Sequence, residues 1–205
     1  MPNIWPSLIP FVAILNPLAL CLYLVGVMED LERKDFARVL FWACVISLAA
    51  FWVFALAGER LLVDLLGIRP GALRVFGGII FLVVGYNYVA KGYKTTEALR
   101  GSLDELPSAI SLPFMIGGGT ITQSILVGKQ HSPLISAAVL FIGVALCFVV
   151  VMAFKSIRDH MQGDRERIFD RYVNIMVRIN GLMIGAISVD MVVSGIRQLW
   201  ATATT

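Results

Sequence analysis

Charged residues are scarce in this chain of 205 residues: only 15% are Asp, Glu, Lys or Arg, whereas 58% are hydrophobic. A water-soluble domain of this length needs many more polar side chains to cover its surface. The mean hydropathy is +0.82, and the charged residues cluster between long apolar runs. These features indicate that lipid surrounds most of the chain. The net charge of +3 is too small to indicate a nucleic-acid partner.

Metal-binding and disulfide patterns are also missing. Cys21, Cys44 and Cys147 each lie inside an apolar run and form no Cys-x-x-Cys pair, and His131 and His160 are in expected loops. We therefore expect no structural disulfide, no metal site and no cofactor. The N-terminus has neither the basic segment nor the small-residue cleavage site of a signal peptide, so its first apolar run is expected to remain as a helix.

The chain does contain six stretches long enough to cross about 30 Å of hydrocarbon. They predict an all-α, polytopic membrane protein with six transmembrane helices. The last stretch has the weakest apolar signal because it contains Arg178 and Asp190. The predicted spans lie near residues 4–27, 38–58, 71–91, 107–128, 134–154 and 175–197.

The distribution of basic residues predicts the orientation of these spans, because cytoplasmic loops are enriched in Lys and Arg. The loops after the first, third and fifth spans share one side of the membrane and carry 12 of the 17 basic residues. We therefore expect these loops in the cytoplasm and both termini on the outer side of the inner membrane. The opposite side carries only Arg60, Arg69, Arg74, Lys129 and Arg197.

The two halves of the chain resemble each other at a nearly constant offset. Pro113 follows Pro10 by 103 residues, and Thr120 follows Asn16 by 104. The segment that begins at Arg74 is likewise repeated 104 residues later. Each half holds three spans, so the halves must cross the membrane in opposite senses, as in many secondary transporters. The sequence predicts a single membrane domain, 1–205, with a first repeat at 1–93, a cytoplasmic linker at 94–106 and a second repeat at 107–205.

The first and fourth spans each contain a predicted break in mid-membrane. Pro17 cannot donate a backbone N–H, and the Asn16-Pro17 pair is typical of the start of a new helix. In the fourth span, Pro113 and the run Gly117-Gly118-Gly119 loosen the backbone. Thr120 and Gln123 then form a capping-box pattern, which predicts a second helix start there.

Two interpretations of these breaks are open. Proline and glycine can simply kink helices or let them pack closely. Alternatively, the two helix starts line a shared cavity, where exposed N–H groups would attract an anionic group such as a carboxylate. The symmetric pair of breaks favours the second interpretation. It assigns substrate binding to Asn16, Pro17, Gly117, Gly118, Gly119, Thr120 and Gln123.

Asp190 is predicted to lie near mid-membrane, where a carboxylate is costly and needs a partner. It is a candidate for binding a substrate ammonium or for carrying a coupled proton, although a structural hydrogen bond would explain it equally well. Arg74 and Arg178 lie at the starts of their spans, where snorkelling toward the interface is the simpler explanation. The sequence shows no nucleophile–base pair and no paired carboxylates at one depth, so no catalytic residue is assigned.

The chain resembles the MarC-type integral membrane proteins, also described as a neutral amino acid transporter family. The resemblance covers nearly the whole chain and is sharpest at Asn16-Pro17-Leu18, at Gly67 through Gly78, at Pro113 through Thr120 and at Arg178 through Gly181. Gly118 stands where the family usually has a proline, and Asp190 stands where an amide is usual. For some members, the resemblance implies transport of small neutral amino acids such as alanine or glycine, for which proton coupling is one option.

These observations predict a secondary transporter of small solutes, in particular small neutral amino acids, that works by alternating access around a mid-membrane site. The expected partners are a small-molecule substrate and the lipid bilayer; a homo-oligomer is compatible with the sequence. A non-transporting membrane scaffold or regulatory subunit is the alternative. It explains the apolar spans but not the paired breaks.

Overall fold

The computed structural model describes residues 4–60, 63–64, 67–91, 103–160 and 164–201. Over these residues the predicted all-α fold is confirmed, and the described part of the chain contains no strand. Most of the predicted linker, 94–106, lies outside the described residues. The helices are α1 (Trp5–Leu15), α2 (Pro17–Tyr23), α3 (Val25–Asp30), α4 (Arg33–Arg60), α5 (Pro70–Lys91), α6 (Leu106–Ile110), α7 (Gly118–Gln130), α8 (Pro133–Asp159) and α9 (Asp164–Ala201), with a π-helical segment, η3 (Ser111–Met115), between α6 and α7.

Five helical stretches of the described chain are long and apolar enough to cross a membrane. They correspond to the first, second, third, fifth and sixth predicted spans. The fourth predicted span, 107–128, is divided among α6, η3 and α7. The last helix, α9, begins at Asp164 rather than near residue 175, so it continues the sixth span through part of the charged run before it.

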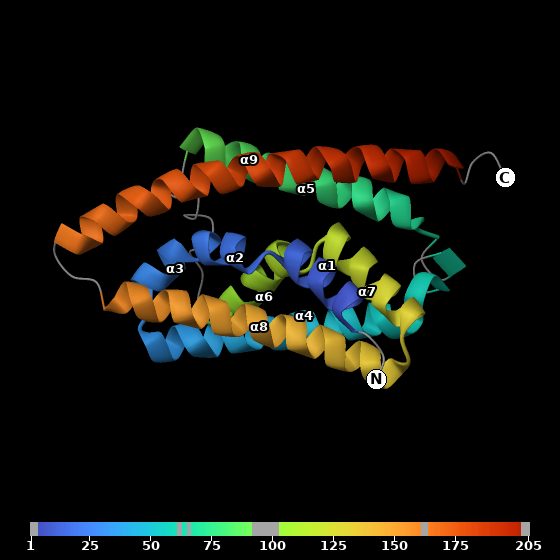
Figure 1. Ribbon diagram of the computed structural model, residues 1–205, viewed down its shortest axis with the longest axis horizontal. Coiled ribbons are helices and arrows are strands. Elements are labelled where there is room, and N and C mark those ends of the chain that lie inside the picture. Colours follow the sequence, from blue (N-terminus) through green and yellow to red (C-terminus); the bar gives the residue numbers. More distant parts are fainter. Residues whose placement is uncertain (1–3, 61–62, 65–66, 92–102, 161–163, 202–205) are drawn as a thin grey trace.

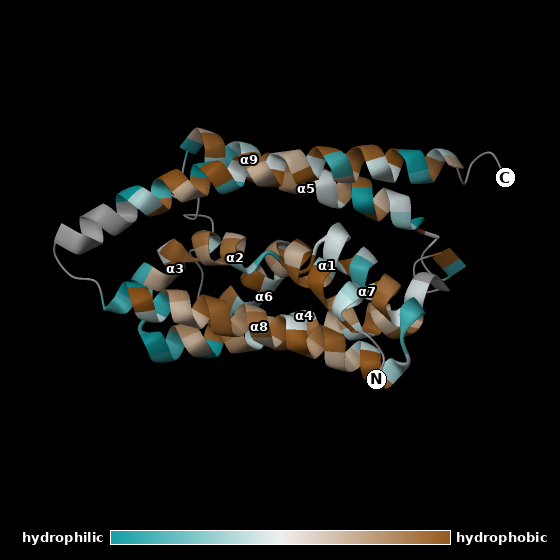
Figure 2. Ribbon diagram, viewed as in Figure 1, coloured by the Kyte–Doolittle hydropathy of each residue, from teal (hydrophilic) through white to brown (hydrophobic). Residues whose placement is uncertain are grey.

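The helices form three layers that run along the long axis of the molecule (Figure 1). The helices α5 and α9 lie side by side on one face, α4 and α8 lie on the other, and α1, α2, α6 and α7 lie between them. Helices α4 and α8, which form the lower layer in this view, run in opposite directions. In the middle layer, the segment α1–α3 runs in the opposite direction to the segment α6–α7. Apolar residues fill the middle of the molecule, and hydrophilic residues gather toward its two ends (Figure 2).

The hydrophobic core lies mostly between the α4–α8 layer and the middle layer, and it extends to Tyr88 of α5 and to Val173, Val177 and Ile184 of α9. Phe11 of α1 is fully buried and contacts the ring of Phe51 on α4 edge to face, with ring centroids 5.3 Å apart. A Cβ added at Gly143 of α8 would lie 2.6 Å from the Phe11 ring, so glycine makes room for this aromatic side chain. Many large apolar side chains outside this core are exposed, for example Phe76, Leu134 and Leu182, as expected of surfaces that face lipid.

Glycines bring the backbones of α5 and α9 into contact. A Cβ at Gly71 would lie 2.8 Å from the carbonyl oxygen of Gly195, and one at Gly85 would lie 2.9 Å from that of Gly181. Small residues that allow backbones to approach are typical of helix pairs in membranes, where dispersion forces replace the hydrophobic effect between helices. The glycine positions therefore set an antiparallel register for α5 and α9.

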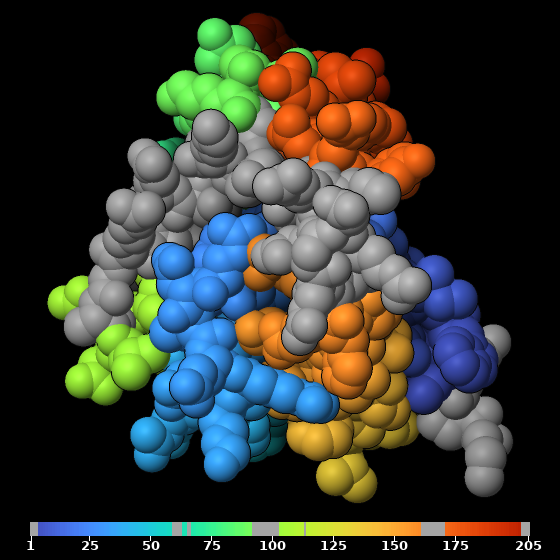
Figure 3. Space-filling model, turned by 90° about the vertical axis from the view of Figure 1, so that its left-hand side faces the viewer, coloured from blue at the N-terminus to red at the C-terminus, as the bar shows by residue number. Residues whose placement is uncertain are grey.

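Charged side chains tie α3 to α8 at the end of the molecule that carries most basic residues. The Nζ atom of Lys155, which is only 4% exposed, donates hydrogen bonds to the carbonyl oxygens of Met28 (2.7 Å) and Leu31 (3.1 Å) and to Oδ1 of Asp159 (2.7 Å). Lysine stabilises a helix C-terminus in this way because it partners the last, unbonded carbonyls. Figure 3 views this end and shows the blue segment of α3 and early α4 beside the orange end of α8.

Candidate functional site

The first break lies where the sequence predicts it, between α1 and α2. Asn16 adopts a left-handed conformation (φ 46°, ψ 72°), which asparagine tolerates better than most residues. Its backbone N–H donates to the carbonyl of Val12 at 2.9 Å, and its Oδ1 accepts a hydrogen bond from the N–H of Ala19 at 3.1 Å. Asn16 therefore ends α1 and caps α2. Because Pro17 has no N–H, it cannot satisfy the carbonyl of Ala13 one turn earlier.

The second break differs in register from the prediction. Helix α7 begins at Gly118 with the extended Gly117 as its N-cap residue, so Thr120 is inside the first turn and is not the cap. The Thr120 hydroxyl accepts a hydrogen bond from the N–H of Gly117 at 2.9 Å and donates to the carbonyl of Met115 at 2.9 Å. The capping-box assignment of Thr120 with Gln123 is wrong. The glycine run allows the helix to start earlier, and Thr120 then stabilises this start from within.

The start of α7 packs against the backbone of α5. A Cβ at Gly118 would lie 2.3 Å from the carbonyl oxygen of Leu73, and one at Gly77 would lie 2.8 Å from the N atom of Gly118. Close packing therefore explains Gly118, as one of the two sequence interpretations proposed. Gly119, the next residue, faces the other way: its nearest neighbours are side-chain atoms of Ile14 and Met191.

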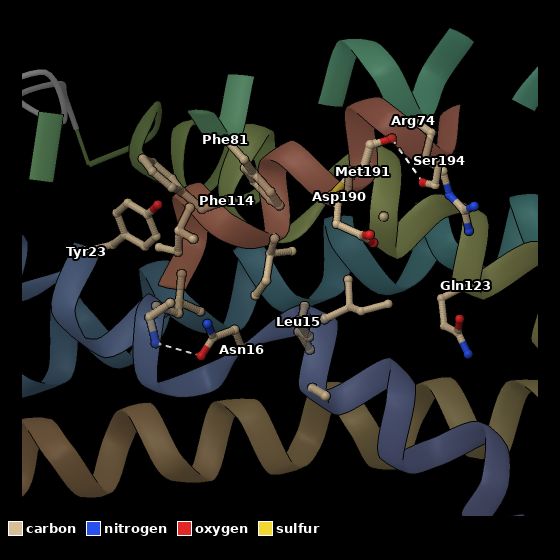
Figure 4. Close-up of a pocket in the computed structure, with 17 residues that line it drawn as sticks. Leu15, Asn16, Tyr23, Arg74, Phe81, Phe114, Gln123, Asp190, Met191 and Ser194 are labelled. Carbon is tan, nitrogen blue, oxygen red and sulfur yellow. Dashed lines mark hydrogen bonds between the residues drawn. The ribbon is translucent and has the colours of Figure 1, made fainter. Parts of the chain in front are cut away.

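A cavity of about 390 Å³ lies beside both breaks, between the middle layer and the α5–α9 pair (Figure 4). This volume is near the lower end of the range of about 300–1,000 Å³ that is common for small-molecule sites. Residues of α1, α2, α5, η3, α7 and α9 contribute to its wall. They are Ala13, Ile14, Leu15, Asn16, Ala19, Leu20, Tyr23, Arg74, Phe81, Phe114, Gly119, Gln123, Ile184, Ile187, Asp190, Met191 and Ser194.

The two ends of this cavity differ in chemistry. Tyr23, Phe81 and Phe114 gather at one end, and Arg74 and Gln123 lie at the other (Figure 4). The Tyr23 ring lies 4.3 Å from that of Phe114 and 4.6 Å from that of Tyr88, measured between ring centroids, and both ring pairs are tilted, so an aromatic cluster forms the apolar end. Asp190 lies between the two ends, on α9. The cavity therefore combines a polar part with opposite charges and an apolar part.

The structure brings together half of the residues that the sequence assigned to the site. Asn16, Gly119, Gln123 and Asp190 line the cavity. Pro17, Gly117, Gly118 and Thr120 are not in its wall, although each helps to form a break next to it.

Arg74 and the aromatic side chains at one end are lining residues that were not expected from the sequence. Arg74 lies on α5 three residues after Gly71 and four before Gly78, and both glycines pack against α9. Residues at these spacings share one helix face. The spacing of Gly71 and Gly78 around Arg74 therefore indicates that Arg74 faces the protein interior and not the lipid interface.

The chain is similar to known membrane proteins over almost its whole length. A family model described as "MarC family integral membrane protein" matches residues 1–200. A UPF0056 membrane protein of Aquifex aeolicus is 24% identical over 204 residues, which cover 94% of this chain and 92% of the relative. A UPF0056 membrane protein of Methanocaldococcus jannaschii is 27% identical over 197 residues (90% and 91%), and YvbG of Bacillus subtilis is 25% identical over 181 residues (84% and 82%). No solved structure matches the chain at a significant level.

Proposed function

The chain belongs to the MarC family of integral membrane proteins, and on this premise we propose that it is a secondary transporter of small solutes, specifically of small neutral amino acids. The observation that carries the proposal is the cavity of about 390 Å³ to which both broken helical segments and the carboxylate of Asp190 contribute. Irregular backbone within a membrane is tolerated where it lines a cavity or is buried in protein. Discontinuous helices beside a central site are typical of transporters.

Alternating access between two inverted halves is the proposed mechanism. The opposed directions of α4 and α8, and of the α1–α3 and α6–α7 segments, support a pseudo-two-fold relation between residues 1–93 and 107–205 (Figure 1). Two such halves can pack in two mirror-related ways, which would open the cavity to either side in turn. In this proposal the fourth span consists of α6, η3 and α7, which brings the number of crossings to six.

The proposed location is the inner membrane, with both termini on the outer side. The arrangement of basic residues supports this orientation, because Arg33, Lys155 and Arg158 lie at the end where α4 begins and α8 ends. The aromatic end of the cavity points toward this cytoplasmic end, and Arg74 lies toward the outer end. We further propose that the protein is not an enzyme, since the described residues of the cavity wall include one carboxylate and no histidine or cysteine as a base or nucleophile.

Transport by the purified full-length chain in proteoliposomes tests this function. Radiolabelled L-alanine and glycine are offered in a concentration gradient, and we expect faster uptake than in protein-free liposomes. Asp190→Asn should slow this uptake about tenfold or more, because a charge-assisted contact with the substrate is worth roughly 1.5–3 kcal/mol. Asp64→Asn, which removes an exposed carboxylate outside the cavity, is the matched control and should transport normally.

Two results would contradict the proposal. One is uptake by the wild-type protein no faster than in protein-free liposomes for every small neutral amino acid, together with no thermal stabilisation by any of them. That outcome would favour the membrane scaffold. The other is equal uptake by Asp190→Asn and Asp64→Asn, which would separate the transported solute from this cavity.

A further inference from the structure

Two opposite charges line the same cavity without neutralising each other. Arg74 comes from α5 and Asp190 from α9. Among the residues that the structure describes, neither side chain forms an ion pair or hydrogen bond, whereas Lys155 and Arg158 both have acidic partners. An ionised group at membrane depth is costly unless it is paired. Asp190 is exposed and Arg74 is half-buried where they line the cavity, so a ligand held there can reach both charges.

The packing of α5 on α9 sets the relative positions of Arg74 and Asp190 along the helix pair. Gly71 and Gly78 on either side of Arg74 contact Gly195 and Val192 of α9, so Arg74 is level with the segment just beyond Asp190. Backbone contacts at both glycines leave little freedom for the two helices to slide. The helix pair thus sets the relative level of Arg74 and Asp190, and both side chains contribute to the cavity wall (Figure 4).

We propose that Arg74 binds the carboxylate of a zwitterionic amino acid while Asp190 binds its ammonium group, so that the pair selects α-amino acids by their two opposite charges. This inference rests on the proposed transport function and assigns the binding mode of that same cavity. Arginine suits the carboxylate because its planar guanidinium donates two parallel hydrogen bonds. Gln123 lies at the same end of the cavity and has an amide N–H₂ to offer as a further donor.

The surroundings of Asp190 favour an ammonium group. The cavity wall also includes Ala13, Ile14 and Leu15, near the C-terminal end of α1. The carbonyls at a helix C-terminus lack partners within the helix and carry partial negative charge. The carbonyl of Ala13 has no partner within the helix because Pro17, four residues later, has no N–H to donate. A cation near Asp190 is therefore stabilised by the carboxylate and by the end of α1 together.

The apolar end of the cavity then receives the amino acid side chain. Phe81 and Phe114 lie beyond Asp190 as seen from Arg74 (Figure 4), and Leu20 and Ile184 add aliphatic surface. A charged side chain placed there would lose its hydration without a partner. A solute with only one of the two backbone charges would leave Arg74 or Asp190 unpaired, which costs more than the missing contact alone. The site thus specifies the zwitterion and excludes plain carboxylates and plain amines.

Binding to the purified full-length protein with three probes tests this assignment. L-Alanine carries both charges, L-alaninamide lacks the carboxylate, and propionate lacks the ammonium group. We expect the wild-type protein to bind L-alanine at least tenfold more tightly than either analogue. Arg74→Gln should weaken L-alanine binding about tenfold or more but change L-alaninamide binding less than about threefold, because only the carboxylate contact is lost. Arg197→Gln removes an exposed arginine of α9 outside the cavity and should leave all three affinities unchanged.

The assignment is overturned if Arg74→Gln binds L-alanine as tightly as the wild type, or weakens L-alanine and L-alaninamide equally, as a structural role would. If Arg74→Gln does not fold, Arg74→Lys is tested instead. It keeps the charge but not the paired donors, so it should still weaken the binding of L-alanine more than the binding of L-alaninamide. The transport function is judged separately. It is rejected if the wild-type protein neither binds nor transports any amino acid. If the wild type transports L-alanine and Arg74→Gln binds L-alanine equally well, only the binding mode is rejected.

Discussion

At the scale of single residues, the breaks in the helices depend on different chemistry. Asn16 and Pro17 specify their break directly, through a missing N–H and a side chain that caps the next helix. Gly117 and Gly118 specify theirs indirectly, because they allow an extended residue and a close approach to α5. Replacing a residue at the second break should therefore act through packing.

We predict that Gly118→Ala destabilises the protein by about 1–3 kcal/mol or more, because the new methyl group would lie 2.3 Å from the Leu73 carbonyl oxygen, a backbone atom that cannot rotate away. Thermal unfolding in detergent measures the effect. Gly185→Ala is the control: a Cβ there has nothing within 4 Å, so stability should stay the same or rise by up to about 1 kcal/mol. Equal melting temperatures for the two variants would contradict the close contact between α5 and α7.

This difference in chemistry also explains what could be predicted from the sequence. The break at Asn16 was predictable because proline acts locally, on the turn that contains it. The register of the second break was not, because glycine permits many conformations and only the contact of Gly118 with Leu73 selects one. Asp190 was a candidate site residue only because of its position within the sixth predicted span. Arg74 was misinterpreted because its position at the start of a span was considered without the glycines that orient its helix face.

At the scale of elements, short helices are held in place by long ones. Helix α3 has only six residues, too few to be stable alone, and its last carbonyls are partnered by Lys155 of α8. The ion pair between Arg158 and Glu29 adds a second tie between the same elements. The position of α3 therefore depends on charges of α8 that no local sequence pattern of α3 reveals.

We predict that Lys155→Met destabilises the protein by about 2–4 kcal/mol, because the carbonyls of Met28 and Leu31 and the carboxylate of Asp159 all lose a charged donor while the apolar stem is retained. Hydrogen exchange should also become faster in α3 than in α4. Lys34→Met removes an exposed lysine at the same end of the molecule and should change neither property. If the hydrogen exchange of α3 is the same in Lys155→Met as in the wild type, the hydrogen bonds of Lys155 do not stabilise this helix.

At the scale of the whole molecule, the long helices and the apolar exterior followed from composition and hydropathy alone, whereas the pairing of α5 with α9 did not. These helices are far apart in sequence, and each was expected to belong to its own half. Their glycines match in an antiparallel register that is visible only once the partner is known. The orientation in the membrane is a separate property, which follows from the basic residues and can be measured directly.

We predict that Ser132 lies on the outer side and Lys34 on the cytoplasmic side. Both are exposed, and the native cysteines are buried, so Ser132→Cys and Lys34→Cys should provide single reactive sites. A membrane-impermeant maleimide applied to intact cells should label the first and not the second; permeabilised cells should show both. The reverse pattern would place both termini in the cytoplasm.

The partnership of α5 and α9 has an electrical consequence. Arg74 and Asp190 lie on two helices, α5 and α9, that pack against each other at glycines. Any movement of this helix pair across the membrane would therefore move one positive and one negative charge through the membrane potential together. A lone charge that crosses the whole field gains or loses about 2.3 kcal/mol per 100 mV, but the contributions of these two cancel. Under the proposed transport of a zwitterion, the loaded protein would carry the same net charge through the field as the empty one. A voltage-dependent rate would then report a co-transported ion, and not the movement of the carrier itself.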